Sequence, residues 1–332
     1  MARVKKLRKV QQETDAPVSP LPEARRALHG PPRRQLGILS RKKTLYSTRR
    51  LIEATRARGY KARVIDVLKC NLVLETGHPR LFHGGVELTG LSVALPRIGA
   101  SVTAHGLNVV RQLEAQGVPM VNSSAAISRS RDKLRALQLL AGAGVDIPRT
   151  VLARGGGNVE LLVEQVGGLP AILKLIQGTQ GVGVMIAHSM AEVESILSTM
   201  WNLGQEILLQ EFIAESRGVD VRALVVSDRV VAAMRREART GEFRSNLHRG
   251  GEGTPVTLSA EFATAAVRAA QVLGLDVAGV DMLEAKDGPK VMEVNSSPGF
   301  EGLEQATGLD IAGSIIGHAV DLARRVRRAM AL

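Results

Sequence analysis

The segment from Gly279 to Gly302, GVDMLEAKDGPKVMEVNSSPGFEG, constrains the fold more than any other part of this chain. Two strand-forming runs flank KDGP, whose residues favour a turn, so the segment predicts a β-hairpin. Residues two apart on a strand share a face, and Glu293 and Asn295 therefore point the same way. The hairpin thus presents a carboxylate and an amide oxygen together.

The length of the turn decides whether Asp281 joins them. A connection over 285–289 would pair Glu284 with Lys290 and bring Asp281 opposite Glu293, whereas an even-length connection would turn Asp281 to the other face. Two carboxylates and an amide oxygen would form a hard-oxygen site, suited to magnesium shared with substrate phosphates. An ordinary hairpin with solvated acids is the alternative.

The composition fits a soluble globular protein and excludes several classes of function. The chain has 332 residues, 45% of them hydrophobic, enough to bury a core over several subdomains. Its 2% of aromatic residues argues against base-stacking platforms for single-stranded nucleic acid. We find no membrane-length apolar run, no signal-peptide core and no histidine spacing typical of zinc, so we expect no membrane association. The single cysteine, Cys70, favours a reducing cytoplasm, and we expect it at a strand end and not as a nucleophile.

Half of the net charge of +12 lies in residues 1–35, which hold nine Lys and Arg against three Asp and Glu. Prolines and few large apolar groups favour a disordered, solvated extension. A segment that steers the protein to RNA or to an acidic partner is the alternative. A second basic cluster, Arg324, Arg325, Arg327 and Arg328, is typical of a helix C-terminus.

Strand and helix patterns alternate along the rest of the chain. LGILS, KARVIDVL, VALPRIG and VPMVNS predict strands, with helices at RRLIEATRARGY and LNVVRQLEAQG, so this part predicts an α/β domain with a parallel sheet. SAAISRSRDKLRALQLL predicts one helix, and four short strands with helices over 158–166 and 190–202 predict a small α+β subdomain. A further hairpin, a long polar loop, a helix over 259–273, the acidic hairpin and a helix from Asp310 complete the chain.

A glycine-rich loop, QGTQGVG, follows Lys174 between two predicted strands. Glycines let backbone N–H groups approach anionic oxygens, and a lysine before such a loop can neutralise phosphate charge. The loop lacks the GxxxxGK[ST] pattern of a P-loop. A hairpin turn with a surface lysine is the alternative.

Several polar residues elsewhere suit the same chemistry. The QEFI stretch over 210–213 could offer backbone groups to an adenine edge, and Asp220 could hold a ribose hydroxyl. Arg244 and Asn246, on a long loop, are donors suited to a transferring phosphoryl group. Arg222 and Arg97 could bind substrate carboxylates, although each could equally be a solvated surface arginine.

These elements, in this order, resemble the ATP-grasp superfamily of carboxylate–amine ligases. The order is Asp132-Lys133, KLIQGTQGVGV, QEFI, DVR, FRSNLHRGG and MEVN.SPG. GILSRKKTLYSTRRL, PRIG, RSRDKLRALQLL and VMEVNSSPGFEGLE resemble the RimK family of glutamate ligases that modify a small-subunit ribosomal protein. The resemblance covers about residues 36–325.

The resemblance implies an ATP-grasp fold of α/β class with α+β lobes. A basic extension (1–35) would precede a parallel-sheet pre-ATP-grasp domain (36–125), a central lid subdomain (126–213) and a C-terminal lobe (214–332). ATP would lie between the last two. We also expect a homo-oligomer, such as a tetramer.

Site residues carry over by position. ATP phosphates would be bound by Lys133 and Lys174 and covered by the loop that holds Gly178, Thr179, Gln180, Gly181 and Gly183. Glu211, Phe212 and Ile213 would hold adenine and Asp220 the ribose. Arg244, Ser245 and Asn246 would lie at the γ-phosphate. Two Mg²⁺ or Mn²⁺ ions would be held by Asp281, Glu293 and Asn295. The catalytic residues would be Arg244, Asn246 and Asn295. Near Met234 the order of acid and base departs from the family pattern, so Arg235 is given no role.

The implied function is ATP- and magnesium-dependent addition of L-glutamate to the C-terminal carboxylate of a small-subunit ribosomal protein, through an acyl phosphate, with poly-glutamate as a further product. An ATP-grasp ligase for another acceptor, such as a pterin or deazaflavin cofactor or an amino-acid carrier protein, is one alternative. A basic ribosome- or RNA-binding protein with a degenerate nucleotide site is another, and the intact set Lys174, Asp281, Glu293 and Asn295 argues against it.

Overall fold

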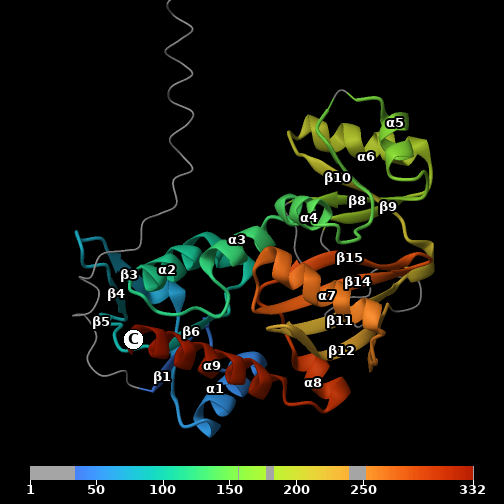
Figure 1. Cartoon of the computed structure of the whole chain (residues 1–332). Coiled ribbons are helices and arrows are strands. Elements are labelled where there is room, and N and C mark those ends of the chain that lie inside the picture. Colours follow the sequence, from blue (N-terminus) through green and yellow to red (C-terminus); the bar gives the residue numbers. More distant parts are fainter. Residues whose placement is uncertain (1–33, 156, 177–182, 239–251, 332) are drawn as a thin grey trace, which may run out of the picture. The chain divides into compact units, whose positions relative to one another are not determined.

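The computed structural model describes residues 34–155, 157–176, 183–238 and 252–331. These residues form three main sheets and one small one, with helices packed on them (Figure 1). Within these ranges, no helix combines the length and the apolar character needed to cross a membrane.

The first domain is built on a three-stranded sheet in the order β2-β1-β6, in which β1 runs parallel to both neighbours. The predicted α/β domain with a parallel sheet is therefore confirmed. A small antiparallel sheet, β3-β4-β5, which the sequence did not predict, follows β2. The elements are β1 (Gln35–Leu39), α1 (Tyr46–Ala57), β2 (Lys61–Ile65), η2 (Val67–Lys69), β3 (Cys70–Val73), β4 (Arg80–His83), β5 (Val86–Glu87), β6 (Val93–Pro96), η3 (Ala100–Val102) and α2 (Thr103–Ala115).

The predicted strand VPMVNS is wrong. Only an isolated bridge joins Met120 to Ala94, whose backbone bonds to Pro119 and Val121. The ladder stops there because Asn122 takes a positive φ of 70° and turns the chain away.

The helix predicted over 124–140 is two helices, α3 (Ser124–Arg131) and α4 (Lys133–Gly142). Asp132 separates them with an extended backbone, and its side chain caps α4 by accepting a hydrogen bond from the N–H of Arg135. Both helices contribute to the core of the C-terminal five-stranded sheet, although the sequence assigned them to the lid. The structural reason is that their buried alanines and leucines pack against α7 (Ala260–Leu273).

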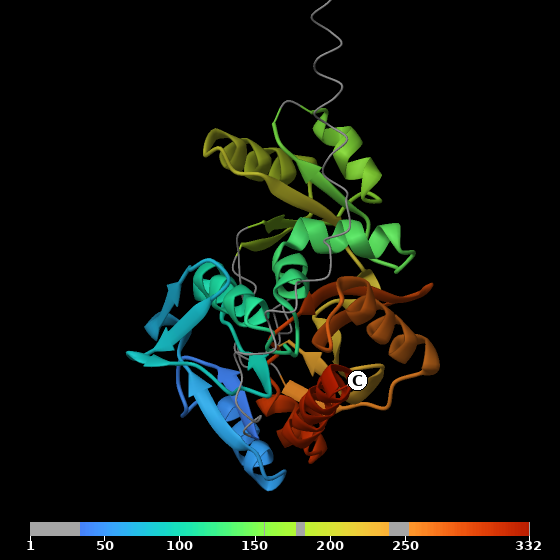
Figure 2. The same ribbon diagram turned by 60° about the vertical axis from the view of Figure 1, so that its left-hand side comes forward.

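The lid is a four-stranded antiparallel sheet in the order β7-β10-β8-β9, and two helices, α5 and α6, pack on it (Figure 2). All four short strands and both helices were predicted. They are β7 (Thr150–Ala153), α5 (Val159–Gln165), β8 (Ala171–Leu175), β9 (Val184–Ala187), α6 (Met190–Asn202) and β10 (Ile207–Glu211).

The C-terminal lobe holds a five-stranded antiparallel sheet in the order β13-β12-β11-β14-β15. The remaining elements are η4 (Ala214–Ser216), β11 (Val219–Val226), β12 (Arg229–Glu237), β13 (Glu252–Pro255), β14 (Val277–Ala285), β15 (Gly288–Asn295), α8 (Glu301–Thr307) and α9 (Ile311–Ala331). The predicted β11–β12 hairpin and the helix over 259–273 are confirmed.

The last helix, α9, packs on the first domain, beside α1 and β6 (Figure 1). One hydrophobic cluster joins Leu36 and Ile38 of β1 to Ile315 and Ile316 of α9 and to Met234 of β12. The first domain and the C-terminal sheet therefore share a core.

Candidate functional site

In the acidic hairpin, Asp281 and Glu293 face each other as predicted, but the strand register that brings them together differs from the predicted one. Asp281 does lie opposite Glu293. The predicted pairing of Glu284 with Lys290 is wrong, however, because Glu284 faces Pro289.

The turn explains the difference. Only Lys286 and Asp287 lie between the paired residues Ala285 and Gly288, and Gly288 takes a φ of 116° that favours glycine. An even connection alone would turn Asp281 to the face opposite Glu293. However, a bulge between the pairs Met282–Val291 and Asp281–Glu293, with Met292 as the extra residue, shifts the register by one. The bulge restores the facing carboxylates.

Asp281 is buried within a cluster of four charges. Arg222 donates to both of its oxygens, from Nε at 2.7 Å and from Nη2 at 2.6 Å, and Arg236 lies 3.3 Å away. Arg236 also donates to both oxygens of the buried Asp220, at 2.6 and 2.7 Å. Burial alone would raise the pKa of Asp281, but the two guanidinium groups outweigh it and hold that pKa below its usual range.

Glu293 differs from Asp281 although the two face each other. Its pKa is raised, first by desolvation and then by the negative charge of Asp281. The side chain of Glu293 is also exposed to solvent. Nδ2 of Asn295 donates to Oδ2 of Asp281 at 3.5 Å, so the amide of Asn295 lies beside Asp281 as the third member of the predicted trio.

This trio fits a divalent cation. Within the described ranges, no group of three His, Cys, Asp or Glu side chains could hold a metal ion. The trio is not such a group, because its third member is the amide of Asn295. All of its donors are oxygens, which magnesium prefers. The oxygens of Asp281 are already bonded to Arg222, so a cation there would share or displace that contact.

Two lysines border the same carboxylate. Lys174 donates to Oε1 of Gln210 at 2.5 Å, and Lys133 donates to the carbonyl of Leu175 at 3.4 Å. Surrounding protein lowers the pKa of Lys174 to about 8 and also lowers that of Lys133, while the charge of Glu293 opposes both shifts. Lys174 of β8 and Lys133 of α4 therefore both lie within electrostatic reach of Glu293 on β15.

Of the glycine-rich loop, Gly178, Thr179, Gln180 and Gly181 lie outside the described residues, as do Arg244, Ser245 and Asn246 of the long polar loop. Gly183 is described. Its φ is 78°, and a Cβ there would lie 2.7 Å from the side chain of Leu175, so the end of the loop requires glycine.

Glu211 links the lid to the acidic hairpin. Its carboxylate accepts bonds from the backbone and the guanidinium of Arg149, both at 3.0 Å, and lies 3.5 Å from Nζ of Lys290. Burial opposes the charge, but the Arg149 hydrogen bonds outweigh it and lower the pKa of Glu211. Phe212 is half-buried and Ile213 buried, and the contact of this segment with adenine stays a prediction.

The structure gives other partners to two predicted ligand-binding residues. Asp220 is 3% exposed and bound to Arg236, so a ribose contact stays a prediction for the nucleotide-bound protein. Arg222 is bound to Asp281 and not turned to an outside carboxylate.

Arg97, the other predicted carboxylate ligand, follows β6 and donates to the carbonyl of Pro298 at 2.6 Å. Cys70 lies at the start of β3, a strand end as predicted. It is buried, and burial raises the pKa of its thiol to about 11. A nucleophilic cysteine is therefore unsupported here.

Sequence reasoning missed three residues of this region. Arg236 is one, and its pairing with Asp220 across β11 and β12 could have been found once that hairpin's register was fixed. Arg131 is another, for which the sequence carried no separate signal. The third is Asn122, whose side chain bonds to the backbone of Asp276, Val277 and Ser296 at both ends of the acidic hairpin.

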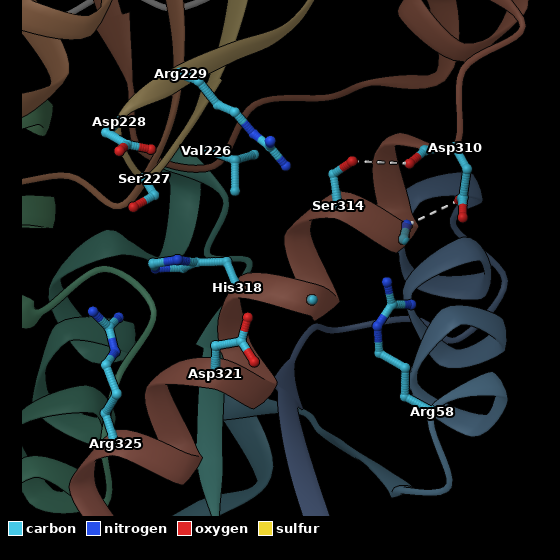
Figure 3. Close-up of a pocket in the computed structure, with 12 residues that line it drawn as sticks. Arg58, Val226, Ser227, Asp228, Arg229, Asp310, Ser314, His318, Asp321 and Arg325 are labelled. Atoms are coloured by element: carbon cyan, nitrogen blue, oxygen red, sulfur yellow. Dashed lines mark hydrogen bonds between the residues drawn. The ribbon is translucent and has the colours of Figure 1, made fainter.

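A crevice of about 550 Å³ lies elsewhere, between α9, the end of α1 and the β11–β12 turn (Figure 3). Arg58, Arg229, Arg325 and Asp321 line it together with His318. None of the predicted site residues that the structure describes lines this crevice. Its lining carries charges of both signs.

Comparison with known proteins identifies the family of this chain. Residues 35–127 match the RimK PreATP-grasp domain, and residues 130–319 match the RimK-like ATP-grasp domain. The chain is 52% identical over 282 residues to a "Probable alpha-L-glutamate ligase" of Pseudoalteromonas translucida (strain TAC 125), covering 85% of this chain and 94% of that protein. It is 53% identical over 284 residues to a protein of the same name from Rhodopirellula baltica, covering 86% and 70%.

Solved structures show the same fold. The RimK domain protein ATP-grasp from Sphaerobacter thermophilus is 26% identical with a TM-score of 0.65, covering 86% of this chain and 99% of that one. The ATP-grasp ligase PsnB complexed with minimal precursor is 22% identical with a TM-score of 0.70, covering 88% and 100%. The expected fold is confirmed, and the chain belongs to the RimK-like ATP-grasp family of carbon–nitrogen ligases.

Proposed function

We propose that this protein uses ATP and magnesium to add L-glutamate to the C-terminal carboxylate of a small-subunit ribosomal protein, and that it can extend the product with further glutamates. The observation that carries the proposal is the meeting of Asp281, Glu293, Lys133 and Lys174 at one place. We choose L-glutamate as the added amino acid because relatives about half identical over most of the chain are named probable alpha-L-glutamate ligases.

The chemistry follows from charge. A carboxylate is a poor electrophile because its charge repels an attacking amine. Transfer of the γ-phosphoryl group of ATP to a carboxylate oxygen releases ADP and gives an acyl phosphate. The amine of glutamate then attacks the acyl carbon and loses a proton, and phosphate leaves as the peptide bond forms. Such a reaction needs positioning and charge neutralisation, and no side-chain nucleophile.

Each residue has a part in this scheme. Lys133 and Lys174 bind the ATP phosphates, with the loop from Gly178 to Gly183 over them. Asp281, Glu293 and Asn295 hold two Mg²⁺ or Mn²⁺ ions, which would neutralise phosphate charge when bound.

The nucleotide and the transferring group have their own residues. Glu211, Phe212 and Ile213 hold adenine, Asp220 contacts the ribose, and Arg244, Ser245 and Asn246 lie at the γ-phosphate. Arg222 acts as the counter-ion of Asp281. We place the reaction in the cytoplasm, where ATP and free glutamate are available, and a homo-oligomer stays a prediction.

The test is mass spectrometry of the purified ribosomal protein after incubation with the enzyme, ATP, magnesium and glutamate, with ADP release measured in parallel. We expect glutamate-sized mass additions that need all components. ADP release with a pterin, a deazaflavin or a carrier protein, and none with the ribosomal protein, would assign another acceptor. No ADP release with any of them, together with binding to ribosomes, would replace the enzyme by a binding protein.

A variant ties the reaction to the hairpin. Glu293→Gln should lower the rate of ADP release at least a hundredfold, because it removes a carboxylate from the metal set. Glu284→Gln is the matched control on the same hairpin, since its carboxylate bonds to Arg235 at 2.9 Å, away from the trio. Equal activity of the two variants would contradict the assignment.

A further inference from the structure

Two arginines outside the ATP-binding set lie close together beside the acidic hairpin. Arg97 follows β6, donates to the carbonyl of Pro298, and has its guanidinium 5.7 Å from the ring centre of Phe300. Arg131 is the last residue of α3 and donates to the carbonyl of Ile98, next to Arg97 in the chain. Contacts with backbone oxygens and a ring fix both guanidinium groups.

Neither charge is matched by an acid. In the part of the chain that the structure describes, neither arginine forms an ion pair with a carboxylate. Nearby, by contrast, Arg222 pairs with Asp281, and Arg236 pairs with both Asp220 and Asp281. The Nε atom of Arg131 is buried and has no hydrogen-bond partner. Burial lowers the pKa of Arg131, and burial and the charge of Arg131 together lower the pKa of Arg97 to about 10. A half-buried pair of like charges with unused donors is a site for anions.

The position of Arg97 and Arg131 in the molecule indicates which anion they would bind. Pro298, which Arg97 contacts, lies three residues after Asn295 of the metal set. Arg131 lies near enough to Glu293 for that carboxylate to raise its pKa against the effect of burial. The pair therefore borders the place where phosphoryl transfer and peptide-bond formation would occur.

We propose that Arg97 and Arg131 bind the two carboxylates of the free L-glutamate substrate and make the enzyme select an amino acid with two acidic groups. This inference rests on the proposed function. The incoming glutamate suits the pair because neither of its carboxylates reacts, so both can stay bound throughout. The acceptor carboxylate suits it less, because a guanidinium on its oxygens would hold the lone pairs that must attack phosphorus.

Direct binding tests the proposal without an acceptor. The full chain, with magnesium and a non-hydrolysable ATP analogue, is titrated calorimetrically with L-glutamate and with L-glutamine. We expect Arg131→Met and Arg97→Met each to weaken glutamate binding about ten- to a hundredfold, the loss of one charge-assisted contact. Arg131→Lys should recover part of the affinity, and the preference for glutamate over glutamine should fall in both methionine variants.

Arg135→Met is the matched control, because Arg135 is exposed on α4 and lies only four residues after Arg131 in the chain. In assays of ADP release with the ribosomal protein, Arg131→Met should raise the KM for glutamate and leave the KM values for ATP and for the acceptor within about twofold, a split that simple loss of structure would not give.

The outcomes separate this inference from the proposed function. Wild-type glutamate binding that Arg131→Met and Arg97→Met leave unchanged overturns the inference and spares the function. A raised KM for the acceptor in place of glutamate also overturns it, by moving the pair to the other substrate. Absence of glutamate binding and of ADP release in the wild type overturns both.

Discussion

At the scale of single residues, the candidate metal ligand Asp281 belongs to a buried network of two acids and two arginines, with Asp220, Arg222 and Arg236. Buried charges persist only when they are paired and hydrogen-bonded, because each loses its hydration. The network places Asp281 firmly and leaves Glu293, outside it, with the raised pKa.

Removing Arg236 should destabilise the fold strongly. Arg236→Met removes both hydrogen bonds from the guanidinium group to the buried Asp220, and we expect the free energy of unfolding to fall by about 3–5 kcal/mol. Urea denaturation measures it. Arg235→Met, the next residue, is the control, because its 40% exposed side chain makes only surface ion pairs and should cost about 1 kcal/mol or less. Similar losses in both variants would show that the network is not stabilising.

Lys174 should make ATP binding sensitive to alkaline pH. In the free protein its pKa is lowered to about 8, so its positive charge is lost as the pH rises through 8. We expect kcat/KM for ATP to fall over this window in the wild type and much less in Lys174→Arg, which stays charged. A profile shared by both proteins would exclude Lys174 as its origin.

The lowered pKa of Lys174 also predicts the direction in which the free energy of unfolding changes with pH. Below pH 8 both the folded and the unfolded states carry the lysine charge, and the folded state bears the full cost of burying it. Between about 8 and 10.5 the unfolded state holds the extra proton, so stability should rise with pH by this contribution. Urea unfolding at two pH values, compared with Lys174→Met, measures the difference.

At the scale of elements, the acidic hairpin depends on Asn122. This buried side chain accepts hydrogen bonds from the N–H groups of Asp276 and Val277 and donates to the carbonyls of Val277 and Ser296. It therefore joins the start of β14 to the residue after β15, and holds both ends of the hairpin at the first domain's last turn.

Asn122→Ala should lower the free energy of unfolding by about 2–4 kcal/mol, because it leaves buried backbone groups unpaired and puts alanine at a positive φ. Asn122→Gly loses the same bonds but tolerates the φ of 70°, and we expect it to be the more stable of the two by about 1 kcal/mol. Thermal and urea denaturation give both values. If alanine were as stable as glycine, backbone strain would have no part.

Most elements could be predicted from local pattern. The structure contains the predicted strands of the lid, the parallel sheet and the helices predicted over 158–166, 190–202 and 259–273. These could be predicted because hydrophobic periodicity and capping residues depend only on nearby sequence. The break at Asp132 and the two-residue turn before Gly288 escaped, since several turn lengths suit the same letters and a bulge can repair the register. The contacts of Arg131 escaped because they lie far away in sequence.

At the scale of the whole molecule, α9 ties the C-terminal end of the chain to the first domain. Ile315 and Ile316 are buried in the cluster that also holds Leu36 of β1 and Leu224 of β11. We therefore expect the first domain and the C-terminal sheet to unfold in one transition.

Ile316→Ala should lower the free energy of unfolding by about 2–5 kcal/mol, because it opens a cavity in this shared core. Hydrogen exchange in β1 and in β11 should speed up together. Leu322→Ala, at a partly buried position on the same helix, is the control and should have a smaller effect. Faster exchange in only one of the two strands would show that the cores are independent.

The sequence by itself determined the family and the order of the elements, and it predicted the carboxylates, amide and lysines of the candidate site, because strand alternation, glycine placement and residue type are local properties. Only the tertiary structure decided how these groups are charged and paired. Whether Asp220 and Arg222 face a ligand or another side chain, and whether Arg97 and Arg131 keep unmatched charges, depends on which distant elements meet and on how much water their meeting removes.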